Sequence, residues 1–123
     1  MNRRQLLFLL VSFLFSTLLF SQEDPYKPVA DEMPQPIDGY EGLYKKVVYP
    51  DLARKNNIEG KVYVLAYINE KGGVDDVKVV KGIGVGCDEA AADVVKKAKF
   101  TQGKLSGQPV KVKLTIPFIF KIR

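Results

Sequence analysis

Few side chains in this sequence are of types that do chemistry on their own. There is one cysteine, Cys87, and no histidine. Histidine-based triads and most zinc sites are therefore excluded. Cys87 could act as a nucleophile only beside a base, and its neighbour Asp88 raises a thiol pKa rather than lowering it. We interpret Cys87 as a small apolar core residue, and a single cysteine cannot form an internal disulfide.

Two other patterns could suggest a reactive site. Asp75 and Asp76 are adjacent on a predicted strand, so their side chains point to opposite faces and do not form an acid/base pair. Gly82, Gly84 and Gly86 resemble a phosphate loop, but they lack the Gly-Lys-Ser/Thr ending and the spacing of a dinucleotide-binding turn. We interpret these glycines as a tight connection from a strand to a helix. The sequence predicts no enzyme, no cofactor site and no metal site.

The N-terminal residues predict export. Arg3 and Arg4 precede an apolar run over residues 6–20, and Ser21 is a small residue suited to cleavage. We expect residues 1–21 to be a signal peptide, with a short membrane anchor as the alternative. An apolar helix of this length spans about 22 Å, against a hydrocarbon core of about 30 Å, which favours cleavage. In both cases we expect the remaining chain to lie outside the cytoplasm and to have no nucleic-acid partner.

Charge divides the exported part in two. Residues 22–43 carry six acidic side chains against Lys27 alone, together with Pro25, Pro28, Pro34 and Pro36. This composition predicts an acidic, Pro-rich linker of polyproline character that reaches at most roughly 65 Å. Residues 44–123 carry 16 Lys and Arg against 8 Asp and Glu, and they predict one basic domain. Such a surface is either simply solvated or prefers acidic partners.

Hydrophobic periodicity predicts the elements of residues 44–123. Pro50 and the residues after it predict a short helix with Tyr49 and Leu52 facing the core. Residues 61–69 and 74–81 predict a hairpin around a turn at 70–73. In the first of these strands, Val62, Val64, Ala66 and Ile68 share one face, and Tyr63, Leu65 and Tyr67 share the other. The tyrosine face predicts a dimer or peptide surface, or the contact of a covering helix.

A second helix and a last strand follow. Ala91, Val94, Val95 and Ala98 form an apolar stripe on a helix over residues 89–99, with Asp88 as its N-cap. Residues 101–108 predict a loop. The strand over 110–120 alternates with its apolar residues on one face. Its Pro117 lacks an N–H, which predicts that this strand lies at a sheet edge.

These elements predict an α+β fold with the order α-β-β-α-β. It is a two-layer sandwich whose three-stranded antiparallel or mixed sheet has the order 2-1-3, with the second helix packed on one face. The last strand then has an unpaired row of N–H and C=O groups, which is a template for an added strand. We expect an extended partner to bind along Val110, Lys111, Val112, Lys113, Leu114, Thr115, Ile116, Pro117 and Phe118.

Residues across this domain form an ordered set that resembles the TonB C-terminal domain family. The set comprises Tyr49-Pro50, Ala53, Ile58-Glu59-Gly60-Lys61-Val62, Gly73-Val74-Asp75-Asp76-Val77, Asp88-Glu89-Ala90-Ala91, Phe100, Gly107-Gln108-Pro109-Val110 and Ile116-Pro117-Phe118. The resemblance covers residues 47–122, and no single motif within it is decisive.

The resemblance implies a partner. In this family the domain lies in the periplasm of Gram-negative bacteria, captures a short segment of an outer-membrane TonB-dependent receptor by strand addition, and transmits force from inner-membrane motor proteins. It also implies a partner-binding role for Tyr49 and Pro50. The absence of histidine and the short linker depart from the transducers of the family. A stand-alone periplasmic interaction or regulatory module without motor coupling, and a homodimer formed through the open edge, therefore remain alternatives.

Overall fold

The computed structural model of the protein describes residues 24–123. The predicted signal peptide or anchor over residues 1–21 therefore lies outside the described residues. The elements are α2 (Gly39–Lys45), α3 (Asp51–Lys55), β1 (Gly60–Ile68), β2 (Val74–Lys81), α4 (Cys87–Lys97), β3 (Gly103–Leu105), β4 (Gln108–Val110) and β5 (Val112–Phe120). No helix among these is long and apolar enough to cross a membrane.

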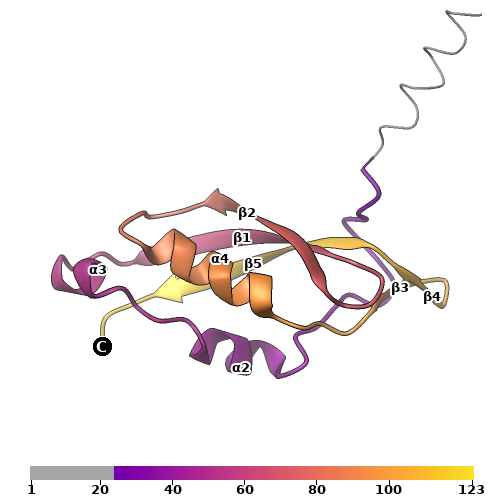
Figure 1. The fold of residues 1–123 in the computed structure, drawn as a ribbon, viewed down its shortest axis with the longest axis horizontal. Coiled ribbons are helices and arrows are strands. Elements are labelled where there is room, and N and C mark those ends of the chain that lie inside the picture. The colour runs from indigo at the N-terminus through magenta and orange to yellow at the C-terminus, as the bar shows by residue number, and fades with distance from the viewer. Residues whose placement is uncertain (1–23) are drawn as a thin grey trace, which may run out of the picture.

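One antiparallel sheet of order β2-β1-β5 organises the domain (Figure 1). Helix α4 packs on one face of it, against β2 and β1. The predicted two-layer α+β architecture and the 2-1-3 strand order are confirmed. Strand β1 is central and pairs with β5 without a break from Gly60 opposite Phe120 to Ile68 opposite Val112. Strand β5 therefore forms one edge of the sheet, as Pro117 predicted.

The β1–β2 hairpin turns where the sequence predicts it. The side-chain oxygen of Asn69 accepts hydrogen bonds from the backbone N–H groups of Lys71 and Gly73, at 3.0 Å each. Gly72 has φ +87°, and a Cβ there would lie 2.0 Å from the carbonyl oxygen of Phe100. Only glycine fits this turn, because both the backbone conformation and the close approach exclude a side chain.

Helix α4 begins two residues earlier than the sequence predicts, and Asp88 is not its N-cap. Gly86 occupies that position with φ 84°. Asp88 lies in the first turn, and its carboxylate accepts hydrogen bonds from the N–H groups of Ile83 and Gly84, at 2.8 and 3.1 Å. The glycine permits an abrupt helix start, which frees the carboxylate to order the preceding loop instead.

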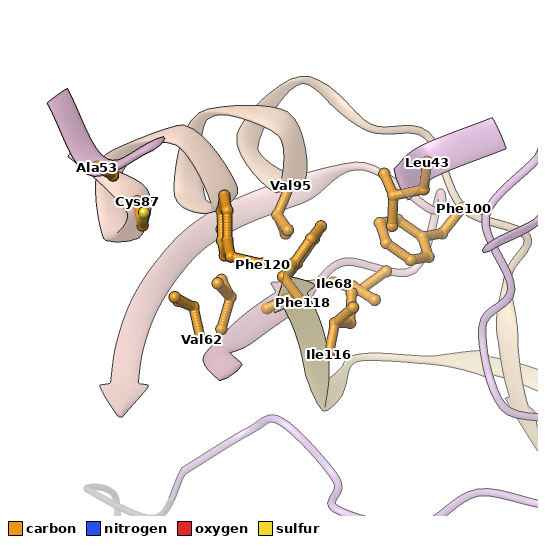
Figure 2. Packing of buried hydrophobic residues seen from close by; sticks show 13 residues of the cluster. Leu43, Ala53, Val62, Ile68, Cys87, Val95, Phe100, Ile116, Phe118 and Phe120 are labelled. Atoms are coloured by element: carbon orange, nitrogen blue, oxygen red, sulfur yellow. The ribbon is translucent and has the colours of Figure 1, made fainter. Parts of the chain in front are cut away.

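The core lies between α4 and the sheet (Figure 2). Strand β5 contributes alternate side chains, Ile116, Phe118 and Phe120, which are at most 4% exposed. Val95 of α4 packs in the same cluster. Each fully buried aliphatic or aromatic side chain contributes about 1.5–3 kcal/mol relative to exposure. The same cluster includes Leu43 of α2 and Ala53 of α3, so both short helices pack on the sheet layer.

The short helix α3 confirms one prediction and corrects another. It spans Asp51–Lys55 directly after Pro50, as expected. Leu52, however, is 64% exposed, whereas Ala53 is fully buried. The helix turns its small residue inward because it lies close against the core, where a leucine side chain has no room.

Residues 101–120 differ in detail from the prediction of a loop followed by one long strand. A small hairpin, β3–β4, pairs Gly103 with Val110 and Leu105 with Gln108. Val110 therefore belongs to this hairpin, and Lys111 lies at the break before β5. Ser106 and Gly107 both have positive φ and form a tight turn. The chain therefore reverses direction once before it enters the main sheet as β5.

The structure also differs from the expectation of an extended linker over residues 22–43. Helix α2 begins inside that stretch, and Pro34 and Pro36 are buried. Glu32 forms a bridge to Lys104, and Pro36 forms one to Phe100. Prolines restrict the backbone, but they also offer apolar surface, and here that surface packs on the domain. Gly103 permits the approach, because a Cβ there would lie 3.2 Å from Pro34 and 2.6 Å from Val112.

Candidate strand-addition site

The outer edge of β5 presents backbone groups to an incoming strand. Neighbouring residues of a strand direct their N–H and C=O groups to opposite sides. Lys111 O and Lys113 N–H point away from β1, because both bond to Lys27. The uninterrupted register with β1 carries this alternation along β5. Thr115, Pro117 and Ile119 therefore also direct their backbone groups outward, and among residues 24–123 no backbone partner occupies them.

The chain itself occupies the first part of this edge. Lys27 forms a parallel bridge with Val112, in which its N–H donates to Lys111 O (2.8 Å) and its C=O accepts from Lys113 N–H (3.0 Å). Asp24 forms an ion pair with Lys113, with Oδ2 and Nζ 3.1 Å apart. Of the residues predicted to bind a partner, Lys111, Val112 and Lys113 are thus engaged by the chain's own N-terminal segment.

Tyr26 fastens this segment to the face of the sheet opposite α4. Its ring meets that of Tyr67 edge to face, with centroids 5.1 Å apart. Its hydroxyl donates a 2.6 Å hydrogen bond to Asp75. This bond raises the pKa of Tyr26 to about 12, and it lowers the pKa of Asp75, with Asn69 as a second donor. The tyrosine face predicted from Tyr63 and Tyr67 is therefore covered at Tyr67 by Tyr26, and not by a helix.

An apolar pocket of about 290 Å³ opens beside the second part of the edge. Tyr44, Val47 and Tyr49 form one wall, and residues 117–121 form the other. Tyr44 meets Phe118 and Tyr49 meets Phe120, each edge to face with centroids 5.3 Å apart. No residue of β1 lines the pocket, so it opens on the outer side of β5.

Tyr49 and Pro50, the predicted partner-binding pair, have different surroundings in the structure. The Tyr49 hydroxyl donates to the carbonyl oxygen of Ile58, and Arg54 lies over its ring at 5.5 Å. Burial, followed by the charges of Cys87 and Glu59, raises the pKa of Tyr49. Tyr49 therefore lines the pocket as a neutral, fixed side chain. Pro50 instead caps α3 and packs near Gly86.

The residues whose types could support chemistry are buried or already hydrogen-bonded. Cys87 is fully buried, and burial raises the pKa of its thiol, with smaller effects from Asp88 and Glu89. The Ile83 and Gly84 amides of the glycine loop, which a phosphate would need, already donate to Asp88. Within residues 24–123, no group of three or more His, Cys, Asp or Glu side chains could hold a metal ion.

Sequence reasoning located the edge strand but missed the residues around it. The candidate site is also lined or contacted by Tyr26, Lys27, Tyr44, Val47 and Lys121. Tyr26 and Lys27 lie in a stretch whose prolines indicate a spacer, and they make no periodic pattern. In the sequence, only the spacing of Tyr44 and Tyr49 could have indicated an aromatic wall beside β5. That spacing does not place both side chains on one face of a helix, so it could not be recognised as a pattern.

Comparison with known proteins gives a consistent result. The family model described as Gram-negative bacterial TonB protein C-terminal matches residues 45–122. Protein TonB of Vibrio cholerae is 32% identical over 75 residues, which cover 60% of this chain and 31% of that protein. The match thus spans about a third of the length of this curated relative.

Solved structures agree with this match. A solution structure of the Helicobacter pylori TonB C-terminal domain has a TM-score of 0.54 and 32% identity, and the match covers 68% of this chain and 77% of that one. For the Pseudomonas aeruginosa TonB C-terminal domain the TM-score is 0.51 and the identity 27%, over 83% of this chain and 91% of that one. A family match to more than half of the chain, on a fold shared with these domains, shows that the chain belongs to the Gram-negative bacterial TonB C-terminal domain family.

Proposed function

We propose that this domain lies in the periplasm and binds a short extended segment of an outer-membrane TonB-dependent receptor by strand addition to β5, in energy-coupled transport. The outward backbone groups of Thr115, Pro117 and Ile119, which have no partner in residues 24–123, carry this proposal. An added strand satisfies such groups, each at about 0.5–1.5 kcal/mol net. Family membership supplies the class of partner. The function is binding and not catalysis.

One observation favours a second candidate, a stand-alone periplasmic interaction or regulatory module without motor coupling. A transducer needs a spacer between membrane and receptor. Residues 27, 32 and 36 form β-bridges with the domain. This stretch is therefore packed on the domain and does not increase the distance that the protein can span. The mass of the mature protein separates the two candidates. Loss of residues 1–21 removes any anchor through which inner-membrane motor proteins could act, and it favours the second.

Binding is tested by titrating the full chain with synthetic peptides that carry the N-terminal segments of outer-membrane receptors from the same cell. Amide signals of Thr115 and Ile119 are expected to shift, and the same peptides with proline at alternate residues are expected to leave them unchanged. Shifts confined to other parts of the domain would refute strand addition at β5. A concentration-dependent mass in sedimentation without peptide would instead support a homodimer through this edge.

A further inference from the structure

The N-terminal segment, residues 24–29, lies on the edge strand without entering the core. Among these residues only Tyr26 is partly buried, and Val29 is 73% exposed. The chain first becomes buried after them, at Ala30 and Pro34. Because the core contains no side chain of residues 24–29, this segment can leave the sheet while the rest of the domain stays folded.

Lys27 occupies the place of one end of a bound strand. It uses an outward C=O and an outward N–H of β5, those of Lys111 and Lys113. A partner strand that runs along the whole edge would need these two groups as well as the outward groups farther along β5. Such a partner forms more ladder hydrogen bonds than the segment does, but it can form all of them only after the segment has left.

Tyr26 holds the segment in this position. Its hydroxyl donates to Asp75 at 2.6 Å, its ring meets that of Tyr67, and Lys111 Nζ lies 5.5 Å from the ring centre. Asp24 Oδ1 accepts a hydrogen bond from the Tyr26 N–H at 2.9 Å, which fixes the backbone just ahead of the ring.

The attachment is incomplete. An open cleft of about 500 Å³ lies beside the Tyr26 ring, lined by Tyr67 and by residues 76–78 of β2. The ion pair of Asp24 with Lys113 joins side chains that are 46% and 34% exposed. Polar contacts at such exposed positions stabilise weakly because water competes for the same groups. The segment is therefore ordered on the sheet but bound weakly enough for a longer strand to displace it.

We propose that residues 24–29 are an intramolecular competitor that closes the Lys111–Lys113 part of β5 and leaves the Thr115–Ile119 part open to a partner strand. The inference rests on the proposed strand addition and adds its regulation. A partner confined to Thr115–Ile119 binds whether or not the segment is in place. A longer partner also pairs with Lys111 and Lys113, so its apparent affinity is reduced in proportion to the fraction of molecules in which the segment is detached.

The first test needs no partner and uses the full chain. Tyr26→Ala removes the hydrogen bond to Asp75 and the ring contact, and it leaves β5 unaltered. Exchange of the Lys113 amide, whose acceptor is Lys27 O, is expected to accelerate about five- to twentyfold. Val29→Ala is the matched control, because Val29 belongs to the same segment but is 73% exposed, and it should leave the exchange unchanged. Circular dichroism checks that both variants fold.

The second test measures partner binding with receptor peptides of two lengths. A synthetic peptide of thirteen residues from the N-terminal segment of an outer-membrane receptor of the same cell is compared with its central five residues. Five residues match Thr115–Ile119, and four more at each end reach Lys111 in either strand direction. Tyr26→Ala is expected to bind the long peptide about five- to twentyfold more tightly than the unchanged chain, and the short peptide equally.

The outcomes distinguish the two proposals. Equal affinity of the unchanged chain and Tyr26→Ala for the long peptide, with amide shifts at Thr115 and Ile119, would overturn the competitor and leave strand addition standing. An equal gain in Val29→Ala would also overturn it. Binding of the long peptide by Tyr26→Ala alone would support both proposals. No binding of either peptide by any of the three chains would overturn both together.

Discussion

Lys27 and Val112 form a parallel bridge, in which Lys27 takes the place of a fourth strand at the edge of the sheet. The acidic segment that contains Lys27 thus uses the same backbone groups that a partner strand would use. Any peptide that pairs with Lys111 and Lys113 must first displace it.

Substitution of Lys27 tests this competition. Lys27→Pro removes the N–H that bonds to Lys111 O, whereas Lys27→Ala keeps it and removes only the side chain. The loss of one backbone hydrogen bond is expected to make opening of the segment about two- to tenfold more frequent. Hydrogen exchange of the Lys113 amide, whose acceptor is Lys27 O, should accelerate by that factor in the proline variant alone. Equal exchange in both variants would contradict the bridge.

Proline substitutions on β5 test the direction of its backbone groups. Thr115→Pro removes an outward N–H that has no described partner, so the free energy of unfolding should fall by at most about 1 kcal/mol. Leu114→Pro removes an N–H on the side of Ala66 in β1, and it should cost about 1–3 kcal/mol because a buried carbonyl loses its donor. Urea unfolding measures both. Peptide binding should be lost in Thr115→Pro although the domain remains folded, and a reversed order of stabilities would refute the alternation.

The turn of the β1–β2 hairpin is expected to be sensitive to any side chain at Gly72. Gly72→Ala places a Cβ 2.0 Å from the carbonyl oxygen of Phe100 and also strains a backbone with φ +87°. The expected loss is about 3 kcal/mol or more. Gly107→Ala is the control, because Gly107 has φ +79° but an added Cβ there would meet nothing within 4 Å, and it should lose only about 1–2 kcal/mol. Denaturant unfolding of the two variants separates the steric contact from the backbone strain.

Attachment of the N-terminal segment should depend on pH at both extremes. The pKa of Asp75 is lowered by the Tyr26 hydroxyl and then by Asn69, and the pKa of Asp24 is lowered by the Tyr26 N–H and then by Lys113. Stability from a carboxylate with a lowered pKa is present above its unfolded pKa of about 4 and is lost as pH falls through its folded pKa. The acid limb should therefore lie below about pH 4.

The alkaline limb has the opposite sign. Hydrogen bonding to Asp75 raises the pKa of Tyr26 to about 12, so its contribution is complete below about pH 10 and is lost as pH rises from there through about 12. Ring-proton shifts of Tyr67, which contacts Tyr26, should report both limbs. The double variant Asp24→Asn/Asp75→Asn should abolish the acid limb, and Tyr26→Phe the alkaline one. A titration unchanged by these substitutions would show that other groups control the segment.

Much of the sheet and its order could be predicted because the pattern of each element is local. Alternation in β1 and β5, the two glycines of the hairpin turn and the apolar stripe of α4 each specify an element within a few residues. Pro117 marks the edge strand, since a proline lacks the N–H that an inner position needs. The same reasoning failed at Asp88, because a helix start depends on the φ of Gly86 as well as on the polar side chain near it.

By itself, then, the sequence determined the α+β class, the strand order and the identity of the strand that carries the open edge. Only the tertiary structure decided how that edge is used. Lys27 reaches Val112, and Tyr44 and Tyr49 face Phe118 and Phe120, across long separations in the chain. Such contacts leave no periodic trace, because they depend on where the elements pack rather than on which elements form. Prolines in residues 25–36 restrict the backbone equally in a free spacer and in a segment packed on the domain, so composition alone could not distinguish the two.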